Sequence, residues 1–255
     1  MKSSNQKVSV IMPSYNSSRT IARAIKSVVD QTYTNFELIC IDDKSEDNSS
    51  EIVKSFSKRD PRISYIEFKE NVGTAKSRDY GIKQSSGRYI AFLDSDDQWL
   101  SNHLEESLLT LKKQNTGFVY SNYFEHNEDG SIKKIINSPK ELTFEDIKWH
   151  CPIGCLTVVL DKKKVFNMSP EFFLASRNDW AIWYEALKKT KGINTGKILS
   201  IRNVQKNSLT SSSLNTIRNT FIFQRKIFKR NIVMSAFSTL YHLYTSYKKK
   251  TVYIK

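Results

Sequence analysis

The sequence predicts an α/β fold with a mostly parallel central sheet flanked by helices, followed by a basic helical extension. Strand-like apolar runs alternate with helical patterns three times within residues 1–95, and the connections between them are short. This alternation is typical of strand–helix–strand units, in which helices cover both faces of a parallel sheet. A chain of 255 residues is long enough to form one large domain with an appendage.

The first half of the chain contains four short runs rich in β-branched and aromatic residues, which are typical of buried strands. These runs cover residues 8–12, 36–41, 63–68 and 89–93. Apolar residues at helical spacing predict helices between them, at 21–29, 51–57 and 74–84. Ser17 or Ser18 is expected to cap the first of these helices.

The second half begins with a predicted helix near 100–114 and a strand at 117–124. A turn at 127–130 would join that strand to another at 132–136 as a hairpin. Two further strands are expected, at 153–160 and 198–201. Between them, a helix at 177–185 would have Asn178 or Asp179 at or near its N-cap. Two helical stretches are expected beyond 208–213. We therefore expect a main domain over 1–210 and a basic helical region over 211–255.

Polar clusters follow three of the predicted strands, at 13–16 (PSYN), 42–43 (DD) and 94–97 (DSDD). Right-handed crossovers bring the carboxyl ends of parallel strands to one edge of a sheet, where ligands of open α/β sheets bind. The three carboxylates of 94–97 repel one another unless a cation lies among them. Mg²⁺ and Mn²⁺ prefer carboxylate and phosphate oxygens. The clusters favour a divalent-metal site over the alternative, an acidic first turn of a helix.

In combination, these motifs resemble the family 2 glycosyltransferases over residues 7–210. The matching segments are PSYN (13–16), DDKSED (42–47), GTAKSRDYG (73–81), GRYIAFLDSDD (87–97) and NDW (178–180). The resemblance implies a GT-A fold and an inverting, metal-dependent enzyme that uses a nucleotide sugar. Bacterial relatives with a similar aromatic, basic C-terminus build O-antigen, capsule, lipopolysaccharide or teichuronic-type polysaccharides.

The resemblance also implies a role for individual residues. Asp42 or Asp43 would hold the uracil or ribose, and Asp96 would ligate Mn²⁺ or Mg²⁺. Asp179 matches the position of the catalytic base, and Trp180 would pack beneath the acceptor. The donor and nucleotide side is expected to comprise Pro13, Tyr15, Asn16, Asp42, Asp43, Lys76, Arg78, Asp94, Ser95 and Arg202.

Several of these assignments have a structural alternative. Asp179 could be an N-cap beside Trp180 as a core anchor, and Lys76 and Arg78 could lie on an exposed helix face. The sequence also departs from the family pattern after the last strand. Many relatives carry a histidine there as a second metal ligand, whereas residues 201–206 (IRNVQK) contain none. Arg202 or Gln205 would contact the diphosphate instead.

The net charge of +14 is concentrated near the C-terminus, because residues 186–255 contain 15 Lys and Arg and no Asp or Glu. Within this region one apolar face recurs at helical spacing, formed by Val233, Phe237, Leu240, Tyr244 and Tyr247. Such a basic amphipathic helix either packs on the catalytic domain or lies on an anionic membrane surface.

These observations lead to one preferred function. Three cysteines are too few for a disulfide framework and favour a reducing cytoplasm, and no apolar stretch is long enough to span a membrane. We expect a cytoplasmic enzyme, peripheral at the inner face of the cell membrane, that moves a hexose or N-acetylhexosamine from a UDP-sugar to a lipid-linked (undecaprenyl-diphosphate type) or polysaccharide acceptor.

Three rival functions remain at the level of sequence. A nucleotidyltransferase would need a glycine-rich phosphate loop after the first strand, where the sequence reads PSYNSSRT. A protein that binds nucleic acid through the basic tail is the second rival, but the strand–helix alternation fits none of the common scaffolds, so no nucleic-acid partner is expected. The third is a non-catalytic relative that serves as a scaffold or binds a membrane.

Overall fold

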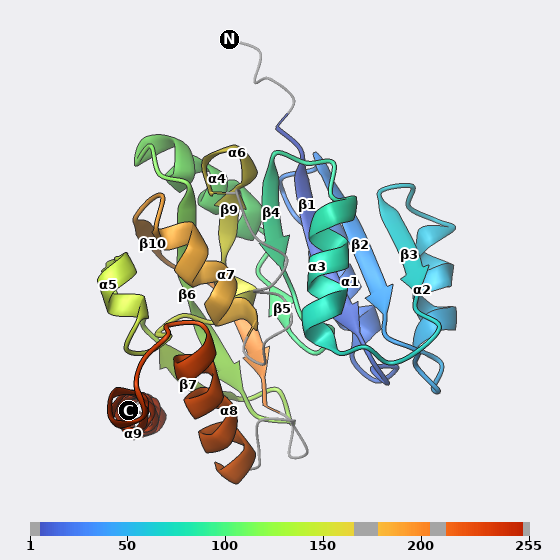
Figure 1. Ribbon diagram of the computed structural model, residues 1–255. Helices are drawn as coiled ribbons and strands as arrows, with labels where there is room; N and C mark the ends of the chain where they lie inside the picture. Colours follow the sequence, from blue (N-terminus) through green and yellow to red (C-terminus); the bar gives the residue numbers. More distant parts are fainter. Residues whose placement is uncertain (1–5, 166–177, 205–212, 252–255) are drawn as a thin grey trace.

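The computed structural model describes residues 6–165, 178–204 and 213–251 (Figure 1). The strands are β1 (Val8–Ser14), β2 (Phe36–Asp42), β3 (Ile63–Glu67), β4 (Tyr89–Phe92), β5 (Gln98–Trp99), β6 (Phe118–His126), β7 (Ile132–Ile136), β8 (Glu141–Leu142), β9 (Val159–Asp161) and β10 (Gly192–Asn203). The helices are α1 (Ile21–Val29), α2 (Ser49–Ser57), α3 (Thr74–Gln84), α4 (His103–Lys113), α5 (Phe144–Ile147), the 3₁₀ turn η1 (Cys155–Thr157), α6 (Lys162–Val165), α7 (Asn178–Leu187), α8 (Ser213–Lys226) and α9 (Ile232–Thr251).

All the described strands belong to one mixed sheet with the order β3-β2-β1-β4-β9-β6-β10-β5, and β7 and β8 pair with β6 and β10. The first four strands in this order are mutually parallel, as are β6 and β10. β9 lies between β4 and β6 and is antiparallel to both. The parallel strands confirm the predicted α/β class. Because β1 lies between β2 and β4, the polar segments that follow these three strands are neighbours.

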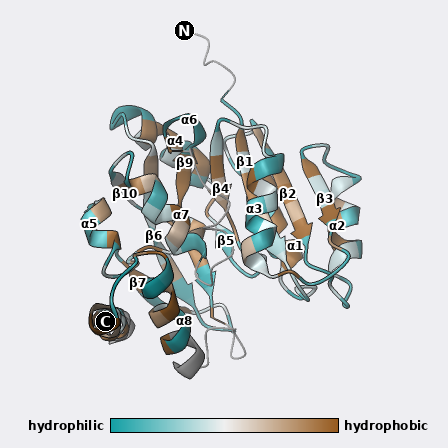
Figure 2. Ribbon diagram, viewed as in Figure 1, coloured by the Kyte–Doolittle hydropathy of each residue, from teal (hydrophilic) through white to brown (hydrophobic). Residues whose placement is uncertain are grey.

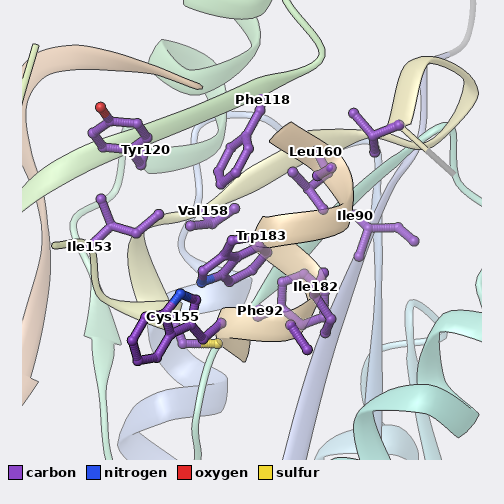
Figure 3. Packing of buried hydrophobic residues seen from close by; sticks show 14 of the residues in the cluster. Ile90, Phe92, Phe118, Tyr120, Ile153, Cys155, Val158, Leu160, Ile182 and Trp183 are labelled. Atoms are coloured by element: carbon purple, nitrogen blue, oxygen red, sulfur yellow. The ribbon is translucent and has the colours of Figure 1, made fainter. Parts of the chain in front are cut away.

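Helices cover both faces of the sheet, and alternate residues of the strands point into two separate cores. One core joins Val10 of β1 to α1, α2 and α4. The other core joins Ile11 to α3 and α7, and α3 and α7 lie on the same side of the sheet in Figure 1. In this second core Trp183 of α7 packs against Phe92 and Phe118, with ring centroids 5.4 and 5.5 Å apart (Figure 3). This contact holds α7 over the centre of the sheet.

Four local predictions need correction. The expected strand at 153–160 divides into η1 and the short β9, and β10 begins at Gly192 rather than near 198. The strands β5 and β8 were not predicted, because two-residue strands carry no periodicity. Neither Ser17 nor Ser18 caps α1; Thr20 occupies that position without a side-chain cap. Ser17 instead forms a tight turn, in which its carbonyl accepts the amides of Thr20 and Ile21.

Two long helices, α8 and α9, end the described part of the chain and pack against each other at one side of the molecule (Figure 1). The proposed boundary at 210/211 lies outside the described residues. Trp180 connects this pair to the main domain, because its ring stacks on Phe223 of α8 and on His242 of α9, both with centroids 4.9 Å apart. None of the described helices is long and apolar enough to span a membrane.

Candidate active site

The three polar clusters meet at the carboxyl edge of the parallel strands, as the sequence predicts. The amide of Asp43, after β2, donates to the carbonyl of Ser14 at the end of β1, at 2.9 Å. The amide of Leu93, after β4, donates to the carbonyl of Ile11 in β1, at 3.1 Å. These backbone contacts put the segments 13–16, 42–43 and 94–97 side by side.

The segment after β1 forms one wall of this edge. Pro13 is buried in the strand, whereas the ring of Tyr15 is 49% exposed. Asn16 has a positive φ of 45°, a conformation that asparagine adopts more readily than most residues. Its amide donates to Ser45 Oγ at 2.9 Å, and its side-chain oxygen accepts the amide of Glu46 at 2.8 Å. Asn16 therefore holds the loop after β2 in place and leaves Tyr15 open to a ligand.

Asp42 and Asp43 are both buried and both engaged within the protein. Asp42 accepts hydrogen bonds from the hydroxyls of Ser45 and Tyr65, the latter at 3.1 Å. Asp43 accepts the amides of Val72 and Gly73 at 2.7 and 2.8 Å. Each carboxylate thus shapes a loop at this edge of the sheet, one after β2 and the other before α3.

The carboxylates of Asp94, Asp96 and Asp97 share one turn after β4. Burial, reinforced by the nearby Asp94 carboxylate, raises the pKa of Asp96 to about 6. Burial and the charges of Asp96 and Asp94 raise the pKa of Asp97 well above its usual value. Arg202 opposes both pKa shifts. The turn is rich in negative charge that the protein itself compensates only in part, which makes it a good place for a cation.

Asn203, at the end of β10, fixes the backbone of this acidic turn. Its side-chain amide donates to the carbonyl of Asp96 at 2.7 Å, and its backbone amide donates to Asp97 Oδ1 at 3.1 Å. The guanidinium of Arg23 in α1 lies 3.4 Å from the same carbonyl of Asp96. Ser95, within the turn, is buried.

Arg78 connects the acidic turn to α7. The side chain is buried; one terminal nitrogen pairs with Asp94 and the other donates to the side-chain oxygen of Asn178 at 2.8 Å. Burial alone would lower the pKa of this guanidinium, but the charges of Asp94, Cys155 and Asp179 and the hydrogen bond to Asp94 together outweigh burial and raise it. The structural alternative, in which both residues lie on an exposed helix face, does not hold for Arg78, whereas Lys76 on the same helix is exposed.

Asp179 follows Asn178 in the first turn of α7 and is half-buried. It contributes to the electrostatic environment of Arg78, as does the buried thiol of Cys155. The start of α7 therefore faces the same region as the acidic turn. Because Arg177 lies outside the described residues, no N-cap role for Asn178 or Asp179 is assigned.

Trp180 is only 1% exposed, and its indole nitrogen donates to the carbonyl of Ile147 at 2.7 Å. Its ring is enclosed by side chains of α8 and α9. A ring covered in this way has no surface left for a sugar to stack on. We therefore correct the expected acceptor contact: Trp180 anchors α7 in the core.

Sequence reasoning missed two residues that position the site, Asn178 and Asn203. Asn178 stands in the NDW motif but looked like a helix cap, and Asn203 follows Arg202 directly. The signal in both cases was a polar side chain beside a predicted functional residue. Arg202 itself is exposed near the acidic turn. Gln205, the alternative contact to the diphosphate, lies outside the described residues.

The donor set suits a hard divalent cation held in part by its substrate. Within the described residues, no group of three or more His, Cys, Asp or Glu side chains is arranged to hold a metal ion. Mg²⁺ and Mn²⁺ usually need only one or two carboxylates, because phosphates and water complete the coordination. Asp96, with Asp94 beside it, would supply that chemistry; burial first, and the Asp94 carboxylate second, raise the pKa of Asp96.

Comparison with known proteins identifies the class and then the family. A family model described as Glycosyl transferase family 2 matches residues 9–230. The protein is thus a transferase enzyme. Within that class, it belongs to glycosyltransferase family 2.

Two curated relatives cover most of the chain. The Escherichia coli protein WfgD, named as a UDP-Glc:α-D-GlcNAc-diphosphoundecaprenol β-1,3-glucosyltransferase, is 38% identical over 83% of this chain and 82% of its own length. TuaG of Bacillus subtilis, named as a putative teichuronic acid biosynthesis glycosyltransferase, is 32% identical over 95% of this chain and 97% of its own length.

Solved structures confirm the GT-A fold at low sequence identity. S. aureus TarS, crystallised with UDP-GlcNAc, superposes with a TM-score of 0.68 at 18% identity, over 95% of this chain and 73% of that chain. A mannosyltransferase from Pyrobaculum calidifontis, in complex with GDP-Man and Mn²⁺, gives a TM-score of 0.65 at 16% identity, over 95% of this chain and 73% of that chain.

Proposed function

We propose that this enzyme transfers a hexose or N-acetylhexosamine, with inversion, from a UDP-sugar to a lipid-linked or polysaccharide acceptor in cell-surface glycan biosynthesis. The observation that carries the proposal is the bridge from Asp94 through Arg78 to Asn178, which joins the acidic turn to the helix of Asp179. The name of WfgD supports a UDP-sugar donor and an undecaprenyl-diphosphate-linked acceptor. The name of TuaG supports a role in polysaccharide synthesis.

The chemistry needs one base and one site for the leaving diphosphate. We assign Asp179 as the base: it takes the proton of the acceptor hydroxyl while that oxygen bonds to the anomeric carbon. The bond from this carbon to the diphosphate breaks on the opposite face, so the configuration inverts and UDP leaves. A glycosidase, by contrast, needs a second carboxyl group as acid or nucleophile.

The residues that would hold Mn²⁺ or Mg²⁺ are Asp96 and Asp94, and such a cation neutralises charge on the leaving diphosphate. Arg202 and the exposed Lys76 add positive charge on the same side. Tyr15, Asn16 and the loops shaped by Asp42 and Asp43 would form the nucleotide pocket. The enzyme would work in the cytoplasm, at the inner face of the cell membrane, where a lipid-linked acceptor is presented.

Calorimetric titration with UDP, GDP, dTDP and CMP, with and without Mn²⁺, tests the donor class. We expect UDP to bind preferentially and only weakly without Mn²⁺. Asp96→Asn should weaken Mn²⁺-dependent UDP binding by about 100-fold, since a bound metal contributes several kcal/mol. Asp30→Asn is the matched control, because Asp30 pairs with Lys26 at the exposed end of α1. Failure of every nucleotide to bind would refute the proposal.

A further inference from the structure

The helix α9 is amphipathic, but it buries its polar face and exposes its apolar face. Its buried side chains are polar, and they recur at helical spacing: Ser235, Ser238, Thr239 and His242. Its most exposed aliphatic side chains are Ile232, Val233, Met234 and Leu240, whereas Phe237 and Tyr241 contact the ring of Trp149. We call the four aliphatic residues the outer face of α9. A surface helix of a soluble protein normally turns its apolar stripe inward, so the outer face calls for a partner.

Polar contacts fix the orientation of α9. The guanidinium of Arg230 donates to the hydroxyl of Ser238 and, at 2.9 Å, to the side-chain oxygen of Gln224 in α8. His242 stacks on Trp180 of the main domain. Rotating the helix to bury its apolar side would break these contacts and expose the stacked rings. The outward position of the apolar residues is therefore part of the fold.

The apolar surface continues from α9 onto α8. A groove of about 380 Å³ between the two helices is lined by Ile217, Arg218, Phe221, Ala236, Thr239 and Leu240. Val233 and Leu240 are 75% and 66% exposed. Contiguous apolar patches on a monomer's surface mark sites of interaction with proteins or membranes. Figure 2 shows α9 end-on at the edge of the molecule, with apolar residues along it.

The charge around the outer face indicates what covers it. Residues 213–255 contain nine Lys and Arg and no Asp or Glu. Three of these, Arg225, Lys226 and Lys229, are exposed at the turn between α8 and α9. A second copy of the chain, packed face to face, would place these like charges opposite one another. An anionic lipid surface complements both the positive charge and the apolar side chains.

We propose that the outer face of α9 docks on the anionic surface of a phospholipid membrane, with the helix lying in the plane of the interface. α9 has 20 residues but is not apolar enough to cross a bilayer. The inference rests on the proposed function, since docking through α9 would hold the active site beside a lipid-linked acceptor. The exposed apolar residues would enter the headgroup region, and the lysines would contact lipid phosphates.

The test is cosedimentation of the full chain with vesicles of phosphatidylglycerol and phosphatidylethanolamine, compared with vesicles of phosphatidylcholine alone. The double variant Val233→Ser/Leu240→Ser should bind the anionic vesicles about 30-fold more weakly, because two exposed apolar side chains are lost. Lys226→Gln/Lys229→Gln should lose about fivefold per charge. Leu109→Ser, at a 57% exposed position on α4, is the control and should bind as the wild type does.

Two outcomes would overturn the docking proposal: wild-type protein that stays in the supernatant with anionic vesicles, or variants that bind them as tightly as wild type. A wild-type dimer that Leu240→Ser converts to a monomer would instead assign the outer face to a second copy. UDP titration of the same samples separates the two proposals. Normal UDP binding without vesicle binding would refute only membrane docking, whereas vesicle binding without nucleotide binding would refute only the transferase mechanism.

Discussion

Arg78 donates a hydrogen bond of 2.8 Å to the side-chain oxygen of Asn178, which lies 100 positions further along the chain. The same guanidinium pairs with Asp94, so α3 links the strand-end carboxylates to the start of α7. The proposed base, Asp179, is the next residue in that helix. In the proposed mechanism, the distance between the donor and acceptor sides of the site therefore depends on this buried bridge.

Replacing Asn178 by alanine should slow the reaction without abolishing donor binding. We expect kcat to fall by about 10- to 100-fold, because a small displacement of a catalytic group is costly. The free energy of unfolding should fall by about 1–2 kcal/mol, because Arg78 loses a buried partner. Steady-state kinetics and urea unfolding measure both effects. Asn127→Ala, in an exposed hairpin turn, is the control; an unchanged kcat in Asn178→Ala would contradict the positioning role.

The variant Asp179→Asn should lose the base while the fold is retained. We expect kcat to fall by about 10²- to 10⁴-fold, the usual contribution of a general base, while UDP affinity stays within about twofold. Glu185→Gln, on the same helix and paired with Lys188, provides the control. The comparison requires kcat, KM for the donor and UDP titration on each protein. A kcat within the range of the control would show that another group accepts the proton.

His103 makes stability depend on pH. Its ring is buried, stacks on Trp99 with centroids 4.3 Å apart, and burial lowers its pKa to about 3. The unfolded state, with a histidine pKa of about 6.5, binds a proton that the folded state refuses, so stability is lost as the pH falls below about 6.5. The expected slope from this residue is about 1.4 kcal/mol per pH unit.

Urea unfolding of wild type and His103→Gln across this pH range isolates the histidine, because other titrating groups contribute equally to both proteins. The difference in unfolding free energy between the two proteins should shrink as the pH falls. A difference that is constant with pH would mean that His103 is protonated in the folded state.

Gly81 allows α3 to approach the sheet closely. A Cβ at this position would lie 2.6 Å from Ile11 Cγ2 and 2.7 Å from Ile41 Cδ1. Gly81→Ala should lower the free energy of unfolding by about 1–2 kcal/mol, since overpacking outweighs the better helix propensity of alanine. Thermal and urea unfolding measure the loss. Lys83→Ala, exposed on the same helix, should change stability by less than about 0.5 kcal/mol, and an equally stable Gly81→Ala would contradict this packing argument.

The sequence by itself determined the strand–helix alternation and the meeting of the polar clusters at one edge, because both follow from local periodicity and from the handedness of crossovers. It also predicted a helix with one apolar face near the C-terminus, since the apolar spacing of Val233, Phe237 and Leu240 is visible in the chain. The short β5 and β8 carried no such signal. Their pairing partners come from distant parts of the chain.

Only the tertiary structure decided which side of α9 faces outward, and that Arg78 is buried whereas Lys76 is exposed. Trp180 changed from a candidate acceptor contact to a core anchor for the same reason. Burial and hydrogen-bond partners depend on elements far apart in sequence, here α3 with α7 and α7 with α8 and α9. Side-chain type predicts what a residue can do, but the packing of distant elements decides which atoms are free to do it.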